Sequence, residues 1–277
     1  MNTGTVVRSF LLLAAASSAA PAAELLVPAY FYPGGPGAAY WSELAAAGPS
    51  GTVTAIMNPG NGPGPAVDPN YVAAVDAAVN VGVDVVGYVY TSYGSRALAT
   101  VLDDIDTYAA RYPVHGIFVD EMSNVPDAAE LAYYGQIYAH VKALHADWTV
   151  IGNPGTTTDE AFLTTADTLV VFEGSRAGYA TYAPAAWNAL YPAERFAHLV
   201  YAAAEPDLAA VLATAAAANA GYVFVTDDVL SPNPWDTLPA YFGAEVAAQT
   251  VPVPVPVALF LPALAVLRAR RRSTRSL

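Results

Sequence analysis

The chain contains no cysteine among its 277 residues. This absence excludes disulfides, thiolate zinc sites and a cysteine nucleophile, but it does not argue against export from the cytoplasm. Histidine is also scarce, and the four histidines lie at no spacing that makes a ligand pair. The sequence also lacks the G-x-S-x-G pattern of serine hydrolases. We therefore expect no metal site and no cofactor.

Basic residues are few in the middle of the chain. All 24 acidic residues fall between Glu24 and Glu245, and five basic residues accompany them, which gives this part a formal net charge of −19. Such a surface repels the phosphates of nucleic acid, so we expect no nucleic-acid partner. A solvated acidic surface is the simplest interpretation, and steering of a cationic polymer is the alternative.

Both ends of the chain resemble targeting segments. Residues 1–23 have Arg8, an apolar run from Phe10 and small residues around Ala20-Pro21-Ala22, a pattern typical of a signal peptide. Residues 250–277 contain a Val-Pro spacer, about 11 apolar residues and the cluster RARRR, which begins at Arg268. The apolar run is too short for an ordinary bilayer span. This layout resembles PEP-CTERM sorting signals, which implies an exosortase as partner; a simple membrane anchor is the alternative. Either interpretation predicts an extracytoplasmic protein, secreted or held at the cell surface.

Between these ends, residues 24–249 alternate between predicted strands and helices. The β-rich segments are 24–32, 53–57, 85–90, 117–120, 149–152, 168–172, 198–202 and 222–226. The helical segments between and after them are 39–47, 71–81, 96–112, 128–146, 160–165, 184–190, 208–220 and 238–248. Eight β-α units predict a single domain of α/β class with a (β/α)8 TIM-barrel fold, and an open doubly wound sheet is the alternative.

Three carboxylates stand at the ends of predicted strands. The segment VHGIFVDE ends in Asp120 and Glu121, and VVFEG contains Glu173. A buried strand tolerates charge only where it leaves the core, so these side chains mark the end of the barrel where active sites lie. Two carboxylates from one barrel suit glycoside hydrolysis. Adjacent strand residues alternate faces, so the pattern leaves open whether Asp120 or Glu121 joins Glu173.

Polar and aromatic residues follow several of the same strands. Rings cover the apolar faces of sugars, while amides and carboxylates bind their hydroxyls. Any single tyrosine could equally be packing, and the loop NPGNGPG could simply turn the chain. The predicted substrate-binding residues are Tyr30, Asn58, Asn61, Tyr90, Tyr93, Asn153 and Asp227.

The motifs together resemble the spherulin-4 family. They include LLVPAYFYPG, AIMNPGNGPG, DPNY, GYVYTSYGSR, HGIFVDE and VVFEG, in this order. The resemblance implies a (β/α)8 barrel similar to glycoside hydrolase family 135, whose characterised members cleave α-1,4-linked N-acetylgalactosamine in galactosamine-rich exopolysaccharide of the biofilm type. It also places the acidic residues of the family on Asp120, Glu121 and Glu173. Under this hypothesis Asp120 is the nucleophile or base, Glu173 is the acid/base, and Glu121 tunes or positions them.

Two other functions fit the same residues. A non-catalytic barrel could hold matrix polysaccharide at the cell surface, and a hydrolase could act on a different hexosamine polymer. We expect a monomer with a polysaccharide partner. The sequence leaves open the linkage, endo or exo action, and retention or inversion, because the last depends on the carboxylate spacing.

Overall fold

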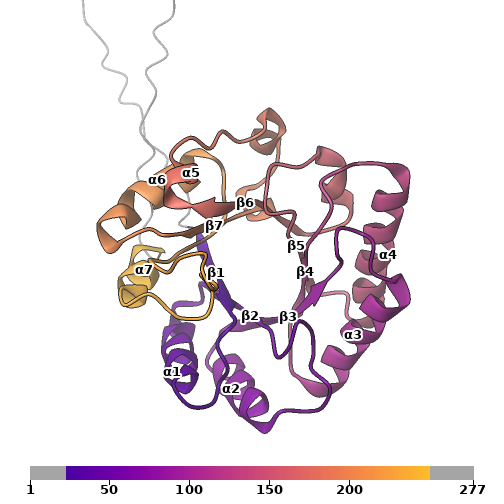
Figure 1. The fold of residues 1–277 in the computed structure, drawn as a ribbon, viewed down its shortest axis with the longest axis horizontal. Coiled ribbons are helices and arrows are strands. Elements are labelled where there is room, and N and C mark those ends of the chain that lie inside the picture. The colour runs from indigo at the N-terminus through magenta and orange to yellow at the C-terminus, as the bar shows by residue number, and fades with distance from the viewer. Residues whose placement is uncertain (1–22, 250–277) are drawn as a thin grey trace, which may run out of the picture.

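Eight parallel strands form a closed barrel in the computed structural model, which describes residues 23–249 (Figure 1). Each strand pairs with the next along the chain, and β1 closes the ring by pairing with β8. The (β/α)8 prediction is therefore confirmed, and the open doubly wound sheet is excluded. The strands are β1 Glu24–Ala29, β2 Val53–Met57, β3 Asp84–Tyr90, β4 Gly116–Asp120, β5 Thr149–Gly152, β6 Thr168–Ser175, β7 Phe196–Tyr201 and β8 Tyr222–Val225.

Helices surround the barrel unevenly (Figure 1). After β5 the predicted helix is the 3-10 helix Glu160–Thr164, and after β6 the one-turn α-helix Arg176–Tyr179 is followed by the 3-10 helix Ala186–Leu190. The α-helices are α1 Gly37–Ala47, α2 Pro69–Val79, α3 Leu98–Arg111, α4 Ala128–Leu144, α5 Arg176–Tyr179, α6 Leu208–Ala217 and α7 Phe242–Gln249. The 3-10 helices are η1 Gly48–Ser50, η2 Glu160–Thr164, η3 Ala186–Leu190, η4 Ala193–Arg195 and η5 Glu205–Asp207.

The strands are buried on both faces, as their apolar sequences predict. Every residue of β2 is buried, for example, because one face packs inside the barrel and the other against helices. Helix α3 buries Val101, Ile105 and Tyr108, which follow one another at helical spacing along a single face. Tyr108 lies so close to β3 that a Cβ on Gly87 would be 2.6 Å from its ring. Glycine at this position allows α3 to approach the barrel.

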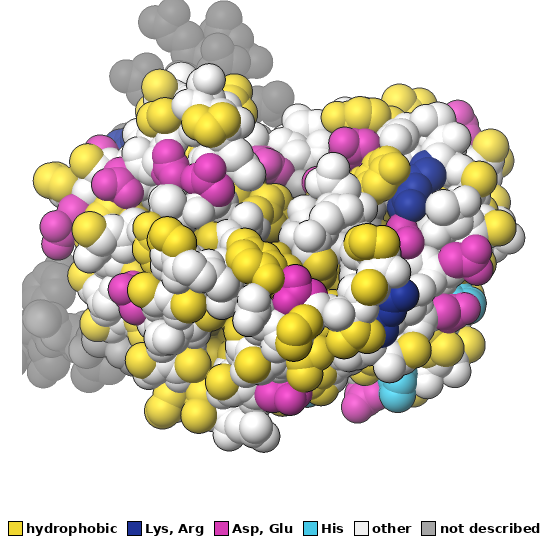
Figure 2. All heavy atoms as spheres, turned by 60° about the horizontal axis from the view of Figure 1, so that its bottom comes forward, with side chains coloured by type: hydrophobic (Ala, Val, Ile, Leu, Met, Phe, Trp, Pro, Cys, Tyr) yellow, Lys and Arg dark blue, Asp and Glu magenta, His cyan; other side chains and the backbone are white. Residues whose placement is uncertain are grey.

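The outer surface is acidic. Figure 2 shows acidic side chains spread over one face of the molecule, with few basic ones between them. Among residues 23–249, no helix is both long and apolar enough to cross a membrane. The predictions for the signal peptide and for the C-terminal sorting segment fall on residues 1–22 and 250–277, outside the part that the structure describes.

Candidate active site

Asp120 and Glu173 meet at the carboxyl end of the barrel. Asp120 is the last residue of β4, and Glu173 lies near the end of β6. Asn153, which directly follows β5 between them, connects the two carboxylates. Its Nδ2 donates to Asp120 Oδ1 at 2.8 Å and to Glu173 Oε2 at 2.7 Å. Because both bonds come from one nitrogen, Asp120 Oδ1 and Glu173 Oε2 lie no more than about 5.5 Å apart. A close pair of this kind fits a retaining glycosidase better than the wider pair of an inverting one.

Each remaining oxygen of the pair also accepts a hydrogen bond. The hydroxyl of Tyr88 donates to Asp120 Oδ2 at 2.7 Å, and the indole Nε1 of Trp235 donates to Glu173 Oε1 at 3.2 Å. Both donors are buried. Asn153 is itself held, because its Oδ1 accepts from the backbone N of Gly155 at 2.8 Å. The orientation of both carboxylates is thus fixed by a network of short contacts.

Burial raises the pKa values of both carboxyls. Burial raises the pKa of Asp120, while its hydrogen bonds from Tyr88 and Asn153 oppose the rise. Burial also raises the pKa of Glu173, and the charge of Asp120 raises it further. Asp120 has the shorter donors, so the arrangement favours an ionised Asp120 beside a protonated Glu173. An acid and a base at adjacent positions are what general acid–base catalysis requires.

Glu121 reaches the same cavity because strand β4 ends at Asp120. Glu121 adopts a left-handed conformation with φ 49°, which breaks the alternation of faces. Its carbonyl oxygen accepts from the backbone N of Tyr93 and from Thr91 Oγ1, both at 2.7 Å. Its carboxylate has no hydrogen-bond partner within residues 23–249. The backbone of Glu121 is therefore held firmly while its side chain stays available to a ligand.

The cavity around these carboxylates has a volume of about 320 Å³. Asp120, Glu121, Glu173 and Asn153 line it, and no lysine, arginine or histidine among residues 23–249 does. Aromatic and apolar groups at its mouth come from Tyr93, Tyr201 and Leu230. Tyr93 is 65% exposed, and its φ of 55° is unusual for a non-glycine residue. The site thus combines acidic groups with exposed rings.

The other predicted binding residues do not line this cavity. Tyr30 packs edge-on against the ring of Tyr88 at 5.6 Å, behind the network. Asn58 Oδ1 accepts a hydrogen bond from the backbone N of Gly62 at 3.2 Å, which stabilises the loop that follows β2. Asn61 and Tyr90 line a separate hollow of about 420 Å³ beside the site.

Asp227 is exposed after β8 and lines neither the carboxylate cavity nor the hollow beside it. Its role in substrate binding stays a prediction, as do those of Tyr30, Asn58, Asn61 and Tyr90.

The histidines lie away from the carboxylate pair. His198 is fully buried against Tyr179, whose hydroxyl is 2.7 Å from Nδ1, and burial lowers its pKa to about 3. Within residues 23–249, no group of three or more His, Asp or Glu side chains is placed to hold a metal ion.

Comparison with known proteins gives a family and a fold. A family model described as "Spherulation-specific family 4" matches residues 24–249. Spherulin-4 of Physarum polycephalum is 36% identical over 238 residues, which cover 81% of this chain and 69% of that protein.

Solved structures give a similar result. Sph3 of Aspergillus clavatus, in complex with GalNAc, superposes with a TM-score of 0.74 and 27% identity over 83% of this chain and 98% of that one. A cyclic alpha-maltosyl-(1→6)-maltose hydrolase from Arthrobacter globiformis superposes with a TM-score of 0.53 and 11% identity, over 83% and 81% of the two chains. This second likeness concerns the fold alone.

Proposed function

The chain belongs to spherulation-specific family 4, and from this premise we propose that it is a glycoside hydrolase that cleaves a hexosamine exopolysaccharide. The observation that carries the proposal is the pair Asp120 and Glu173, bridged by one amide of Asn153. A glycosidase needs two carboxylates at a fixed separation, one to donate a proton and one to attack. A protein that only binds polysaccharide does not need a buried pair with raised pKa values.

The spacing supports a double displacement with retention. Protonated Glu173 donates its proton to the glycosidic oxygen while Asp120 attacks the anomeric carbon, which breaks the glycosidic bond and forms a glycosyl-enzyme ester. Glu173, now ionised, removes a proton from water, and the resulting hydroxide attacks the same carbon and releases Asp120. The two steps return both carboxyls to their starting states. An inverting enzyme needs a wider separation, about 6.5–9.5 Å, to fit a water between them.

The contacts support a separate role for Glu121. Both oxygens of Asp120 accept hydrogen bonds, which fixes the orientation that a nucleophile requires. The Glu121 carboxylate lines the cavity without such a bond and can accept hydrogen bonds from the substrate. Glu121 and the exposed ring of Tyr93 are linked through the backbone hydrogen bond from Tyr93 N to Glu121 O. We assign these two residues to substrate binding, with the ring covering one face of a sugar and the carboxylate accepting from its hydroxyl or amino groups.

The proposed substrate is an α-1,4-linked polymer of N-acetylgalactosamine and galactosamine. The similarity to Sph3, whose structure holds GalNAc, supports this choice. An acidic cavity without basic side chains also suits a polymer that carries neutral and cationic units. In an α-linked N-acetyl sugar, the acetamido group lies on the same face as the leaving group and cannot displace it. The protein therefore has to supply both carboxylates.

A panel of polymers tests the proposed activity. We expect reducing ends to be released from α-1,4-linked galactosaminan and not from β-linked chitin, chitosan or poly-N-acetylglucosamine. A bound α-linkage points its leaving oxygen to Glu173 and exposes the opposite face of the anomeric carbon to Asp120, and a β-linkage in the same orientation does not. The measurement is the yield of reducing ends over time for each polymer at equal mass. Release from a β-linked polymer alone would assign a different substrate. Binding to the α-linked polymer without release would favour a matrix-binding protein.

A polysaccharide outside the cell requires an exported enzyme, and we propose that residues 1–23 direct export and that residues 250–277 retain the protein at the surface. Replacing Arg268, Arg270, Arg271 and Arg272 by alanine is expected to shift the protein from the cell-surface fraction to the medium, because this cluster is the charged stop of the tail. The measurement is immunodetection in both fractions. Replacing Arg111, on α3, serves as the control, and an unchanged distribution of the tail variant would contradict the proposal.

A further inference from the structure

Two buried hydroxyl groups lie directly behind the acidic end of β4. Thr91 directly follows β3 and is fully buried, and Tyr134, in the middle of α4, is 2% exposed. Their oxygens are 3.1 Å apart. Neither side chain lines the carboxylate cavity, so neither is placed to touch a substrate bound there. Both instead contact the backbone that leaves β4.

The two hydroxyls form a relay to this backbone. The hydroxyl of Tyr134 accepts from the backbone N of Ser123 at 2.8 Å, which leaves its own proton for Thr91 Oγ1. Thr91 Oγ1 in turn donates to the carbonyl oxygen of Glu121 at 2.7 Å, with the carbonyl oxygen of Asp120 at 3.1 Å as a second acceptor. The hydroxyl relay of Thr91 and Tyr134 therefore connects α4 with the turn that carries the acidic residues.

The turn contains a residue in an unfavourable conformation. Glu121 has a φ of 49°, and a left-handed backbone persists in a residue with a side chain only where the surroundings fix it. The backbone N of Tyr93 and the hydroxyl relay both donate to its carbonyl oxygen. With a negative φ, Glu121 would follow the alternation of the strand and face away from the cavity that Asp120 lines.

We propose that Thr91 and Tyr134 are positioning residues, which keep the Glu121 carboxylate in the active-site cavity. This inference rests on the proposed function, in which Glu121 binds the substrate. Without the hydroxyl relay, residue 121 relaxes to a negative φ and its carboxylate turns away from the cavity. The side chain of Asp120 keeps both of its hydrogen-bond donors. Substrate binding therefore weakens, while the chemical step is largely kept.

A kinetic test compares two changes at one position. Thr91→Val keeps the shape and removes the hydroxyl, so we expect KM for α-1,4-linked galactosaminan to rise about three- to tenfold with kcat within about twofold of the parent. Tyr134→Phe removes the other hydroxyl and should raise KM in the same way. Thr91→Ser restores a hydroxyl and should return KM to within about twofold of the parent. An unchanged KM in Thr91→Val or Tyr134→Phe, or an equal rise in Thr91→Ser, would overturn the proposal.

Thr168→Val is the matched control for the loss of a buried hydroxyl. Thr168, the first residue of β6, is 3% exposed, and its Oγ1 donates to a backbone carbonyl at 2.8 Å. This variant should lower the melting temperature as Thr91→Val does, because each loses one buried hydrogen bond. It should leave KM unchanged, because Thr168 lies at the end of β6 away from Glu173. An equal rise in KM would show that general destabilisation explains both variants and would contradict the proposal.

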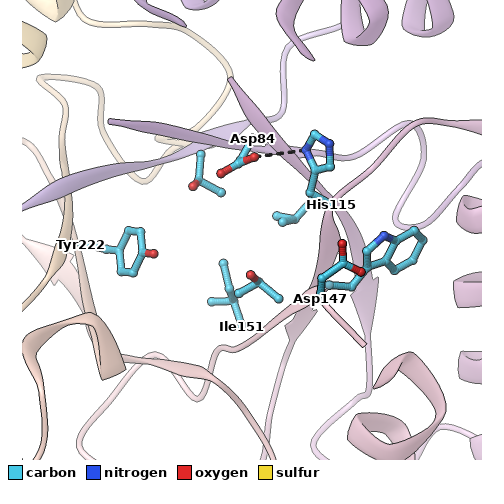
Figure 3. A pocket seen from close by; sticks show the side chains of 9 residues that line it. Asp84, His115, Asp147, Ile151 and Tyr222 are labelled. Atoms are coloured by element: carbon cyan, nitrogen blue, oxygen red, sulfur yellow. Dashed lines mark ion pairs between the residues drawn. The ribbon is translucent and has the colours of Figure 1, made fainter. Parts of the chain in front are cut away.

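A double-mutant cycle tests whether the relay acts through Glu121. In a chain with Glu121→Ala, Thr91→Val should raise KM by less than about twofold more, because the carboxylate that the relay positions is already gone. Asp84→Ala is the control for loss of an acid. Asp84 lines a cavity at the amino-terminal end of the barrel, where it lies 3.2 Å from His115 Nδ1 (Figure 3). In this background Thr91→Val should keep its full effect, and full additivity with Glu121→Ala would overturn the proposal.

Crystal structures of the Thr91 variants test the geometry without a substrate. We expect a negative φ at residue 121 and a carboxylate outside the cavity in Thr91→Val, and the left-handed conformation of the parent in Thr91→Ser. A left-handed Glu121 with its carboxylate still in the cavity of Thr91→Val would overturn the proposal. If the parent chain hydrolyses no galactosaminan, the proposed function fails, and these structures decide the role of the hydroxyl relay separately.

Discussion

Glu173→Gln is expected to lower kcat on α-1,4-linked galactosaminan by about 10²–10⁴-fold, the usual effect of removing a general acid–base group. Asp120→Asn should lower it by about 10⁴-fold or more, because the covalent step loses its nucleophile. Both variants keep the size of the side chain, so both should fold like the parent. Asp103→Asn, an exposed carboxylate on α3, is the control and should keep full activity.

Added azide separates the two roles. In Asp120→Asn, azide should replace the missing nucleophile and give a product of inverted, β configuration. In Glu173→Gln, azide should attack the glycosyl-enzyme and give a product of retained, α configuration, because Asp120 is still present. The products are identified by NMR. Exchange of these two outcomes would reverse the assignments of Asp120 and Glu173, and full activity in both variants would remove them from the mechanism.

Asn153→Ala is expected to lower kcat/KM by about 10²–10³-fold, comparable to the loss of one preorganised donor in other enzymes. Its amide holds both carboxylates at once, at 2.8 Å and 2.7 Å, so alanine leaves each with one fewer donor and no fixed separation. Asn80→Ala, at the exposed end of α2, is the control.

The pH dependence distinguishes this role of Asn153 from a general loss of structure. The amide of Asn153 donates to the ionised forms and so lowers both pKa values. The parent enzyme needs Asp120 ionised and Glu173 protonated, which gives a bell-shaped profile. In Asn153→Ala both pKa values rise, so both limbs of the profile of kcat/KM should move to higher pH. A profile of lower height but unchanged position would contradict this role.

The barrel and the two strand-end carboxylates were predictable from the sequence for a physical reason. Buried parallel strands give short apolar runs that end abruptly in polar residues, and β4 and β6 both show this pattern. The segments after β5 and β6 were less predictable, because five residues of mixed polarity are compatible with either a turn of α-helix or a 3-10 helix.

Two donors of the network were missed at the sequence level, and only one had a signal. Tyr88 and Tyr90 lie two residues apart in β3 and so share a face, which made Tyr88 a candidate once Tyr90 was chosen. Trp235 lies in an irregular segment 62 residues after Glu173, and no periodicity connects it with the site. Its position depends on the path of the chain after β8, where the backbone N of Tyr30 donates to the carbonyl of Trp235 at 3.1 Å.

The conformation of Glu121 could not be read from its neighbours either. Alternation along a strand places Asp120 and Glu121 on opposite faces, and only a left-handed residue lets both line one cavity. A positive φ is uncommon outside glycine, so a glutamate at this position did not predict a left-handed backbone. The structure shows the three carboxylates lining one cavity.

The anomeric configuration of the first product tests the central claim most directly. The parent enzyme is mixed with α-1,4-linked galactosaminan in an NMR tube, and the anomeric protons of new reducing ends are followed before mutarotation. Two carboxylates whose facing oxygens, Asp120 Oδ1 and Glu173 Oε2, lie no more than about 5.5 Å apart predict that the α-anomer forms first. First appearance of the β-anomer, or no new reducing ends, would contradict the double displacement by Asp120 and Glu173.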